Sequence, residues 1–169
     1  MARGEAPARP DPGTLLTVGH SNRSLAEFLA ILAAHHVEEI ADVRRFPRSR
    51  RHPHFAIDAL APALAGAGIA YRHWPELGGF RKAAKDSPNV GLENASFRGY
   101  ADHMATAAFQ DALDRLLAAA RERVVAVMCA EAFVMQCHRR LIADAAVARG
   151  VPVEHVAGAG HVLHRDTAR

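Results

Sequence analysis

Five consecutive apolar residues at positions 124–128 restrict the possible folds of this chain more than any other segment. A strand with one face in water alternates apolar and polar side chains, whereas a strand covered on both faces is apolar throughout. The run therefore predicts a strand in the middle of a parallel sheet that carries helices on both faces. Cys129 follows directly, at the carboxyl end of this predicted strand.

Shorter apolar runs alternate with helical patterns along the rest of the chain. The predicted strands are residues 15–18, 37–42, 69–74, 124–128 and 153–156. The predicted helices begin near Leu25 and span 57–67, 97–120 (with a break near Thr106) and 137–149. This alternation implies right-handed crossovers between parallel strands. We therefore predict an α/β fold with a mostly parallel central sheet and helices on both faces, a three-layer sandwich.

Two segments between these elements are informative. Ser24 can cap the first helix, and Glu27 three residues later completes a capping box, so the loop at 19–22 should be well held. Residues 75–96 carry glycines and prolines with little periodicity. Long irregular segments of this kind are usually functional or mobile.

Length and composition are those of one folded domain. Of 169 residues, 50% are hydrophobic and 23% are charged, which argues against extensive disorder. We expect a single α/β domain over residues 14–164 after a flexible tail over 1–13. No apolar run approaches the roughly 20 residues needed to cross a bilayer, and the N-terminal residues lack the apolar stretch of a secretory signal. The two cysteines are therefore expected to be reduced thiols in the cytoplasm.

The positive charge is concentrated in one short segment. The formal net charge is +3, and the segment at 44–52 contains Arg44, Arg45, Arg48, Arg50, Arg51 and His52. This pattern favours an anionic partner, either a small molecule or a nucleic acid. A solvated charged loop is the alternative. The sequence indicates neither a cofactor nor an oligomeric state.

Polar or reactive residues follow the predicted strands. In open parallel sheets ligands bind beyond the carboxyl ends of the strands, so these residues are expected to converge. They are His20, Ser21, Asn22, Asp42, Arg44, Glu76, Cys129 and Glu131.

Cys129 is the candidate nucleophile, because loop amides, a helix N-terminus and nearby cations can stabilise a thiolate there. Cys137, His138 and Arg139 open the next helix, where His138 can act as acid or base and Arg139 can clamp an anion. Glu131 and His20 are further candidates for proton transfer. The alternatives are a buried cysteine that ends a core strand and an exposed helix start.

Arg98 and Tyr100 form a weaker signal within residues 96–102. A basic residue beside an aromatic one can hold a phosphate while the ring stacks on a base. Tyr100 and the neighbouring Phe97 can equally belong to the core.

A metal site and the common phosphate loops are not favoured. The possible ligands are Cys129, Cys137, His138 and either His20 or His161, but they lack the paired close spacings of zinc modules. The chain contains neither G-x-x-x-x-G-K-[ST] nor G-x-G-x-x-G. Met135 stands where a Cys-x5-Arg loop would have its arginine.

Several motifs occur in order along the chain. They are Thr17-Val18-Gly19-His20-Ser21-Asn22-Arg23, Asp42-Val43-Arg44 with Pro47-Arg48-Ser49, Pro75-Glu76-Leu77-Gly78-Gly79, Ser96-Phe97-Arg98-Gly99-Tyr100-Ala101-Asp102, and Met128-Cys129-Ala130-Glu131 with Cys137-His138-Arg139. From about Leu15 to His161 the chain resembles the bacterial and archaeal domain-of-unknown-function family 488 (DUF488). The resemblance implies a fold and the position of a site, but no reaction. The family often has a proline between the last two motifs, whereas this chain has Phe133-Val134-Met135.

The sequence is compatible with three functions. The first is an enzyme acting on a phosphate-bearing substrate, a nucleotide or nucleic acid, held by Arg44, Arg98 and Arg139, with Glu131 or Cys129 reacting. The second is a rhodanese-like sulfur-transfer or redox enzyme that uses Cys129 and Cys137, although no Cys-x-x-Gly-x-Arg-Ser loop follows Cys129. The third is a non-catalytic nucleic-acid-binding module that grips backbone phosphate through residues 44–52.

Overall fold

The computed structural model describes residues 7–134, 137–158 and 160–164. Within them, six strands form one sheet in the order β3-β2-β4-β1-β5-β6. The strands are β1 (Leu15–Gly19), β2 (Glu39–Asp42), β3 (Ala70–His73), β4 (Val125–Cys129), β5 (Val153–Ala157) and β6 (Gly160–Leu163). Neighbouring strands are parallel except β5 and β6, which are antiparallel.

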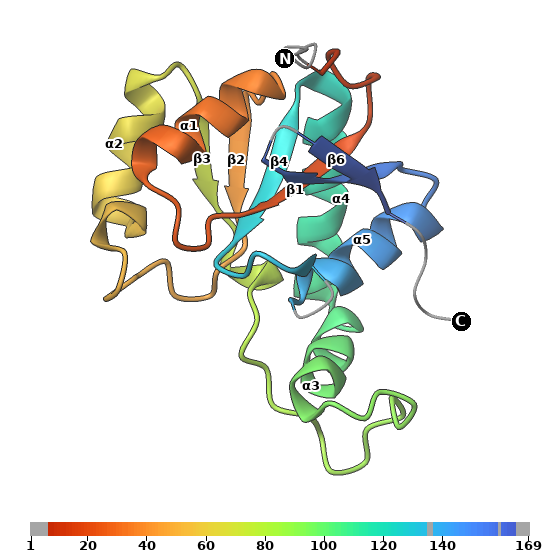
Figure 1. Ribbon diagram of the computed structural model, residues 1–169. Helices are drawn as coiled ribbons and strands as arrows, with labels where there is room; N and C mark the ends of the chain where they lie inside the picture. Colours follow the sequence, from red (N-terminus) through yellow and green to blue (C-terminus); the bar gives the residue numbers. More distant parts are fainter. Residues whose placement is uncertain (1–6, 135–136, 159, 165–169) are drawn as a thin grey trace.

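Helices cover both faces of this sheet (Figure 1). They are α1 (Leu25–Ala34), α2 (Ile57–Gly66), α3 (Ala95–Met104), α4 (Ala107–Glu122) and α5 (Arg139–Ala148), with short 3₁₀ turns η1 (Pro53–Phe55) and η2 (Pro75–Leu77). One core cluster joins α1 and α2 to the sheet, and a second joins α4 and α5 to its other face. The predicted α/β fold with a mostly parallel sheet and helices on both faces is confirmed.

Strand β4 lies in the middle of the sheet, between β1 and β2. All five of its residues are buried, as predicted from the uninterrupted apolar run. Alternate β1 residues point to opposite faces: Leu16 and Val18 pack with α1 and α2, whereas Leu15 packs with α4 and α5. This alternation decides on which side of the sheet each polar group lies.

Several element boundaries differ from the predictions by one or two residues, and three differences are informative. The predicted helix 97–120 is two helices, and Thr106 at the predicted break caps α4 by accepting from the Phe109 backbone N–H at 3.3 Å. Helix α5 begins at Arg139 rather than at residue 137. Strand β6 was not predicted, because only its pairing with β5 makes this short polar-apolar segment a strand.

Two predictions near the N-terminus can be compared with the structure. Ser24 caps α1, accepting from the Glu27 backbone N–H at 3.1 Å. Residues 1–6 of the predicted tail lie outside the described residues. Of the rest, Arg9 donates to Glu38 across 3.1 Å, and His36 Nε2 lies 3.1 Å from the Pro7 carbonyl oxygen. Residues 7–13 therefore contact the amino-terminal side of the sheet.

In the described part of the chain, none of the helices combines the length and the apolar character that a membrane crossing requires.

Candidate functional site

A cavity of about 580 Å³ lies at the carboxyl ends of β2 and β4. It is lined by the loop after β2 (Arg44, Arg45, Phe46, Arg48), the loop after η2 (Gly79, Phe80), α3 (Ser96, Phe97, Tyr100), the end of β4 with its loop (Cys129, Ala130, Glu131) and the residues before α5 (Cys137, His138). The loop before α3, and α3 itself, extend beyond this end of the sheet (Figure 1). Five segments of the chain thus meet where ligands bind in parallel α/β sheets.

Two cysteines contact each other in the wall of this cavity. The Sγ atoms of Cys129 and Cys137 lie 2.6 Å apart, and the two residues are only 2% and 4% exposed. A hydrogen bond from Cys129 lowers the pKa of Cys137 to about 4, although burial acts against this shift. Burial raises the pKa of Cys129. The arrangement favours one negative charge on the pair, with one proton shared between the two sulfur atoms.

Arg139 supplies a positive charge beside this pair. The residue is 1% exposed, and its Nε donates to Cys129 Sγ at 3.0 Å. Its Nη2 donates to the Glu131 carbonyl oxygen at 2.7 Å, and its Nη1 donates to Thr17 Oγ1 at 2.9 Å. Three fixed bonds direct the guanidinium at the sulfur atoms, and its charge favours the thiolate there.

His138 is held against the same pair. Its Nε2 lies 3.0 Å from the Val43 carbonyl oxygen, which can only accept, so Nε2 carries a proton. Its Nδ1 faces Cys137 Sγ at 3.6 Å, and its ring lies 5.1 Å from that of Tyr100. Gly79 leaves room for this ring, because a Cβ atom there would lie only 3.3 Å from Nδ1. His138 is therefore oriented to accept the proton of the pair when that proton is on Cys137.

Arg44 is engaged by a neighbouring carboxylate. Its Nε and Nη2 donate to the two oxygens of Asp42 at 2.9 and 2.7 Å, and its Nη1 donates to the Phe55 carbonyl oxygen at 2.7 Å. Tyr71 also donates to Asp42, at 2.5 Å. The pair is buried, with side chains 7% and 0% exposed. Asp42 thus neutralises Arg44, which leaves the positive potential of the cavity to other arginines.

Arg45 and Arg48 bring that charge to the lining of the cavity. Arg45 donates to the Phe80 carbonyl oxygen at 2.7 Å, and its guanidinium lies 5.3 Å from the centre of the Phe46 ring. Neither arginine has an ion pair among the described residues. Phe46 and Phe80 are 61% and 81% exposed, an unusual exposure for two aromatic rings beside a cavity.

The family model described as a domain of unknown function, DUF488, matches residues 24–146. The chain belongs to the DUF488 family. This match confirms the resemblance inferred from the motifs and spans both the basic segment and the two cysteines. Among curated proteins and solved structures, none matches the chain.

Six of the predicted site residues of this DUF488 chain line the cavity: Arg44, Tyr100, Cys129, Glu131, Cys137 and His138. Two more, Asp42 and Arg139, bind directly to lining residues. The remaining predicted residues lie outside the lining of the cavity, namely His20, Ser21, Asn22, Glu76 and Arg98.

His20 lies on the α1 and α2 side of the sheet. Its ring stacks on Phe55 with centroids 4.3 Å apart, and its Nδ1 lies 2.8 Å from the Ser21 carbonyl oxygen. Burial lowers the pKa of His20 to about 4. Its Nε2 is buried without a hydrogen-bond partner among the described residues. The predicted convergence thus brings Cys129 and Glu131 to the cavity, while His20 packs behind the sheet.

A metal centre was not favoured by the sequence. The described residues contain no group of three or more His, Cys, Asp or Glu arranged to hold a metal ion. His20 lies on the other side of the sheet from the cysteines, and the side chain of His161 lies outside the described part of the chain.

Sequence reasoning missed Thr17 and the two aromatic rings of the cavity, Phe46 and Phe80. Thr17 interrupts the apolar run at 15–18 and is fully buried. A polar residue on a buried strand needs a hydrogen-bond partner, so this interruption was a usable signal. Phe46 follows Arg45 in the basic segment, but nothing in the sequence indicated that Phe80 lies near it, with ring centres 6.3 Å apart.

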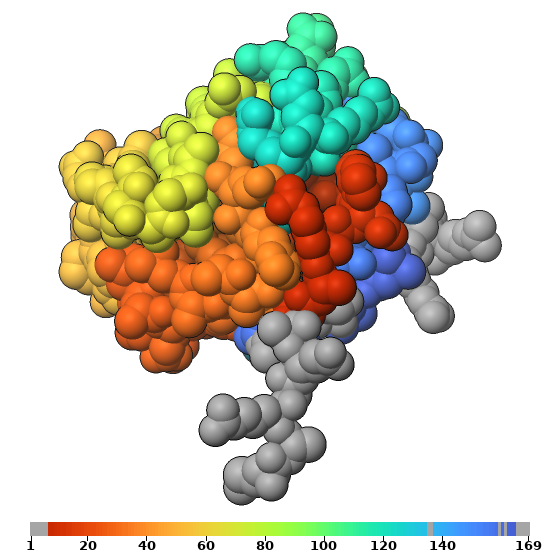
Figure 2. Space-filling model, turned by 90° about the horizontal axis from the view of Figure 1, so that it is seen from above, coloured from red at the N-terminus to blue at the C-terminus, as the bar shows by residue number. Residues whose placement is uncertain are grey.

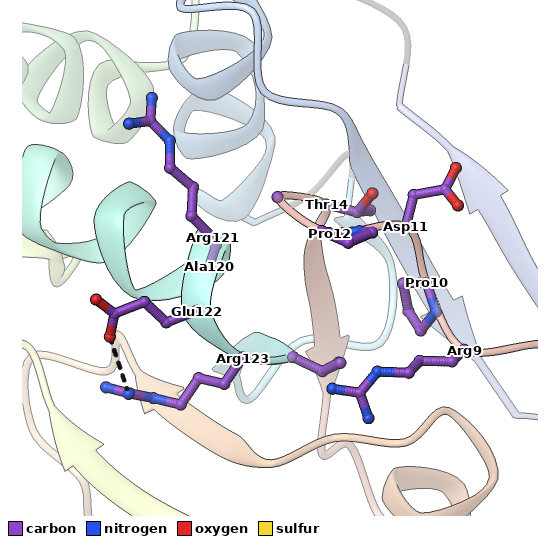
Figure 3. A pocket seen from close by; sticks show the side chains of 11 residues that line it. Arg9, Pro10, Asp11, Pro12, Thr14, Ala120, Arg121, Glu122 and Arg123 are labelled. Atoms are coloured by element: carbon purple, nitrogen blue, oxygen red, sulfur yellow. Dashed lines mark ion pairs between the residues drawn. The ribbon is translucent and has the colours of Figure 1, made fainter.

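A second cavity, of about 340 Å³, lies at the amino-terminal side of the sheet. It is lined by residues 9–14 and 120–124, and Figure 2 shows the red N-terminal segment beside the teal end of α4. Two of its three arginines are ion-paired: Arg9 with Glu38, and Arg123 with Glu39 and with Glu122, the last pair dashed in Figure 3. The third, Arg121, has no ion pair among the described residues, so this cavity offers one unpaired arginine to a ligand, against two in the first cavity.

Proposed function

We propose that this DUF488 chain is an enzyme that acts on a small phosphate-bearing substrate, such as a nucleotide, through the thiolate of the Cys129–Cys137 pair. One observation carries the proposal: the two contacting thiols line the same cavity as Arg45 and Arg48. A reactive anion and an anion-binding wall thus face the same space. The proposal requires reduced thiols, the state expected in the cytoplasm.

The substrate class follows from the charges and rings of the wall. Asp42 neutralises Arg44, but Arg45 and Arg48 have no ion pair among the described residues and can bind phosphate. Phe46, Phe80 and Phe97 add ring surface on which a base can stack. A volume of about 580 Å³ lies within the usual range for small-molecule pockets. Charge, rings and size together favour a nucleotide over inorganic phosphate.

The reactive groups have separate roles. The thiolate is the nucleophile, stabilised by Arg139 at 3.0 Å from Cys129 Sγ. His138, with Nδ1 at 3.6 Å from Cys137 Sγ, exchanges the proton of the pair. Glu131 lines the same cavity and is exposed, so it can exchange a proton with the substrate. Tyr100 donates to the Leu77 carbonyl oxygen at 2.8 Å and supports the wall.

Thiol–disulfide exchange is a second candidate, favoured by the 2.6 Å contact between the two sulfur atoms. Cys129, the sulfur that Arg139 contacts, attacks the disulfide of a small-molecule oxidant as the thiolate, while the proton of the pair stays on Cys137. This step forms a mixed disulfide and releases one half of the oxidant as a thiolate. Cys137 then loses its proton to His138 Nδ1, 3.6 Å from its sulfur, and attacks the mixed disulfide, releasing the second thiolate. Two electrons pass from the cysteine pair to the oxidant, and an internal disulfide forms.

Calorimetric titration of the reduced protein with a nucleoside monophosphate, the matching nucleoside and a single-stranded oligonucleotide tests the substrate class. We expect the nucleotide to bind and the nucleoside to bind about tenfold more weakly, since it lacks the charged group. Arg45→Gln and Arg48→Gln should each weaken nucleotide binding about tenfold. Arg50→Gln is the matched control, because Arg50 is an exposed arginine of the same segment that does not line the cavity.

The remaining alternative, a non-catalytic nucleic-acid-binding module, predicts a different result. The oligonucleotide would bind, the mononucleotide would not, and all three arginine substitutions would weaken binding to a similar extent with a steep salt dependence. Cys129→Ser would then leave binding unchanged in every assay, and the protein would have no thiol-dependent activity. That combination would replace the proposed enzyme with the binding module.

A further inference from the structure

A chain of hydrogen bonds runs from the thiol pair to the middle of α5. Arg139, which donates to Cys129, also donates to Thr17 Oγ1 at 2.9 Å. Thr17 Oγ1 lies 2.6 Å from His155 Nδ1, and His155 Nε2 lies 2.7 Å from His164 Nδ1. His164 Nε2 lies 2.6 Å from an oxygen of Asp144. Five groups from β1, β5, α5 and the residue after β6 are thus linked by four short contacts.

The fold places these groups side by side. Thr17 and His155 are direct register partners in the parallel pair β1–β5, so their side chains lie on the same face of the sheet. That face is covered by α5, which contributes both Arg139 and Asp144. The backbone N–H of His164 donates to the Val153 carbonyl oxygen at 2.8 Å, which holds its ring beside His155.

The donors and acceptors give the hydrogen-bond chain one direction, from Arg139 to Asp144. A guanidinium can only donate, so Thr17 Oγ1 accepts from Arg139, and its single proton can go to His155 Nδ1 when that nitrogen is unprotonated. His155 then carries its proton on Nε2 and donates to His164 Nδ1. His164 in turn carries its proton on Nε2 and donates to Asp144. This arrangement requires neutral rings, and burial lowers the pKa of His155 to about 4.

The charges at the two ends of this hydrogen-bond chain, Arg139 and Asp144, explain its effect on the cysteine pair. Arg139 is 1% exposed, yet its hydrogen-bond acceptors among the described residues are a hydroxyl, two carbonyl oxygens and the Cys129 sulfur. None of these is a carboxylate. A buried cation without an anion is costly, so a thiolate on the cysteine pair is its natural partner. At the far end, Asp144 accepts from His164 and so favours the tautomers in which His155 Nδ1 is unprotonated. Thr17 can then direct its proton to His155 and a lone pair to Arg139.

We propose that Thr17, His155, His164 and Asp144 are positioning residues that hold Arg139 against Cys129 and so keep the cysteine pair ionised at neutral pH. They act through Arg139 and touch neither sulfur atom. The inference concerns the thiolate on which the proposed function rests. It can be tested without any substrate, because the ionisation of the pair is a property of the protein alone.

Other charged and titratable groups also face the thiol pair and must stay constant in the test. They are His138 and Arg139 at the start of α5, Tyr100 of α3, and His155 of β5, which interacts electrostatically with Cys137. Of these, only His155 belongs to the four positioning residues. Substitutions at Thr17 therefore give the cleanest test, since threonine does not titrate.

The experiment measures the rate of cysteine alkylation by iodoacetamide, and the ultraviolet absorbance of the thiolate, as functions of pH. Thr17→Val keeps the shape but removes the hydroxyl, and should raise the apparent pKa of the pair by about one unit, a tenfold loss of thiolate on the acid side. Thr17→Ser keeps the hydroxyl and should restore the wild-type profile. Thr14→Val is the matched control, because Thr14 is a buried threonine just before the same strand.

His155→Asn provides a second variant if Thr17→Val does not fold. Its amide oxygen can still accept from Thr17 but no longer reaches His164, so the pKa should rise by less than in Thr17→Val. If the hydrogen-bond chain has a purely structural role, both variants should have lower melting temperatures and unchanged alkylation profiles. That result overturns the inference. If the profiles shift but no nucleotide binds, the inference stands and the proposed substrate is wrong.

Discussion

The carbonyl oxygen of Glu131 lies 1.8 Å from the position that a Cβ atom on Gly19 would occupy. The backbone after β4 therefore folds directly over the end of β1, an approach that a glycine permits. The same oxygen accepts from Arg139 at 2.7 Å. Gly19 thus helps to set the position of the guanidinium beside the cysteine pair, although it contacts neither sulfur atom.

Gly19→Ala should displace residues 130–132 and lower both stability and thiol reactivity. We expect the free energy of unfolding to fall by about 2 kcal/mol or more, because the added atom overlaps backbone that cannot move as a side chain can. Urea denaturation measures the loss. Gly66→Ala is the control, since no atom of the described residues outside its own helix lies within 4 Å of its would-be Cβ. Equal stability of both variants would contradict the close approach.

The stability of the protein should depend on pH through Cys137. The pKa of this residue falls from its ordinary value of 9.0 to about 4 in the folded state. A lowered pKa adds stability that is present above the unfolded value and is lost as the pH falls towards the folded value. Between about pH 8 and pH 5 the free energy of unfolding should therefore decrease with a slope of up to about 1.4 kcal/mol per pH unit from this group.

Chemical denaturation at a series of pH values, compared between the wild type and Cys137→Ser, isolates this contribution. Burial also lowers the pKa values of His20 and His155, which add a slope of the same sign. Both histidines are present in both proteins, so the difference between the two curves reports the cysteine pair. Parallel curves would show that the pair carries no negative charge in the folded state.

Mild oxidation with a small-molecule disulfide should convert the cysteine pair to an internal disulfide. The two sulfur atoms already contact each other at 2.6 Å, so the mixed disulfide first formed is resolved within the chain. Mass spectrometry should find the loss of two hydrogens in the wild type. Cys129→Ser and Cys137→Ser should instead retain the added thiol. A stable mixed disulfide on the wild type would mean that the second cysteine cannot reach the first.

Asp42→Asn tests the buried pair next to the cavity. The substitution removes the charge that holds Arg44 through two bonds and leaves a buried guanidinium without its anion. We expect the free energy of unfolding to fall by about 3 kcal/mol. Glu38→Gln is the control, because the Arg9–Glu38 pair is exposed and worth little. A loss of nucleotide binding with full stability would instead assign Arg44 to the substrate.

Local sequence patterns were sufficient for much of the fold. The apolar run of β4, the Ser24 cap and the break at Thr106 depend on neighbours along the chain, and each is found where it was predicted. Strand β6 was missed because its structure depends on pairing with β5. The cavity residues after β2 and β4 were also predicted, since parallel strands bring their carboxyl ends to one edge.

The sequence by itself thus determined the α/β layers, the family and the residues at the end of β4, because these follow from periodicity and motif order. Tertiary structure decided which groups act together. The pleat of β1 places Thr17 and Gly19 on the face with Arg139, and the next residue, His20, packs against Phe55 on the other side. Register paired Thr17 with His155, and residues 129 and 137 became contacting thiols. Such pairings depend on distances between strands and helices, which no local pattern encodes.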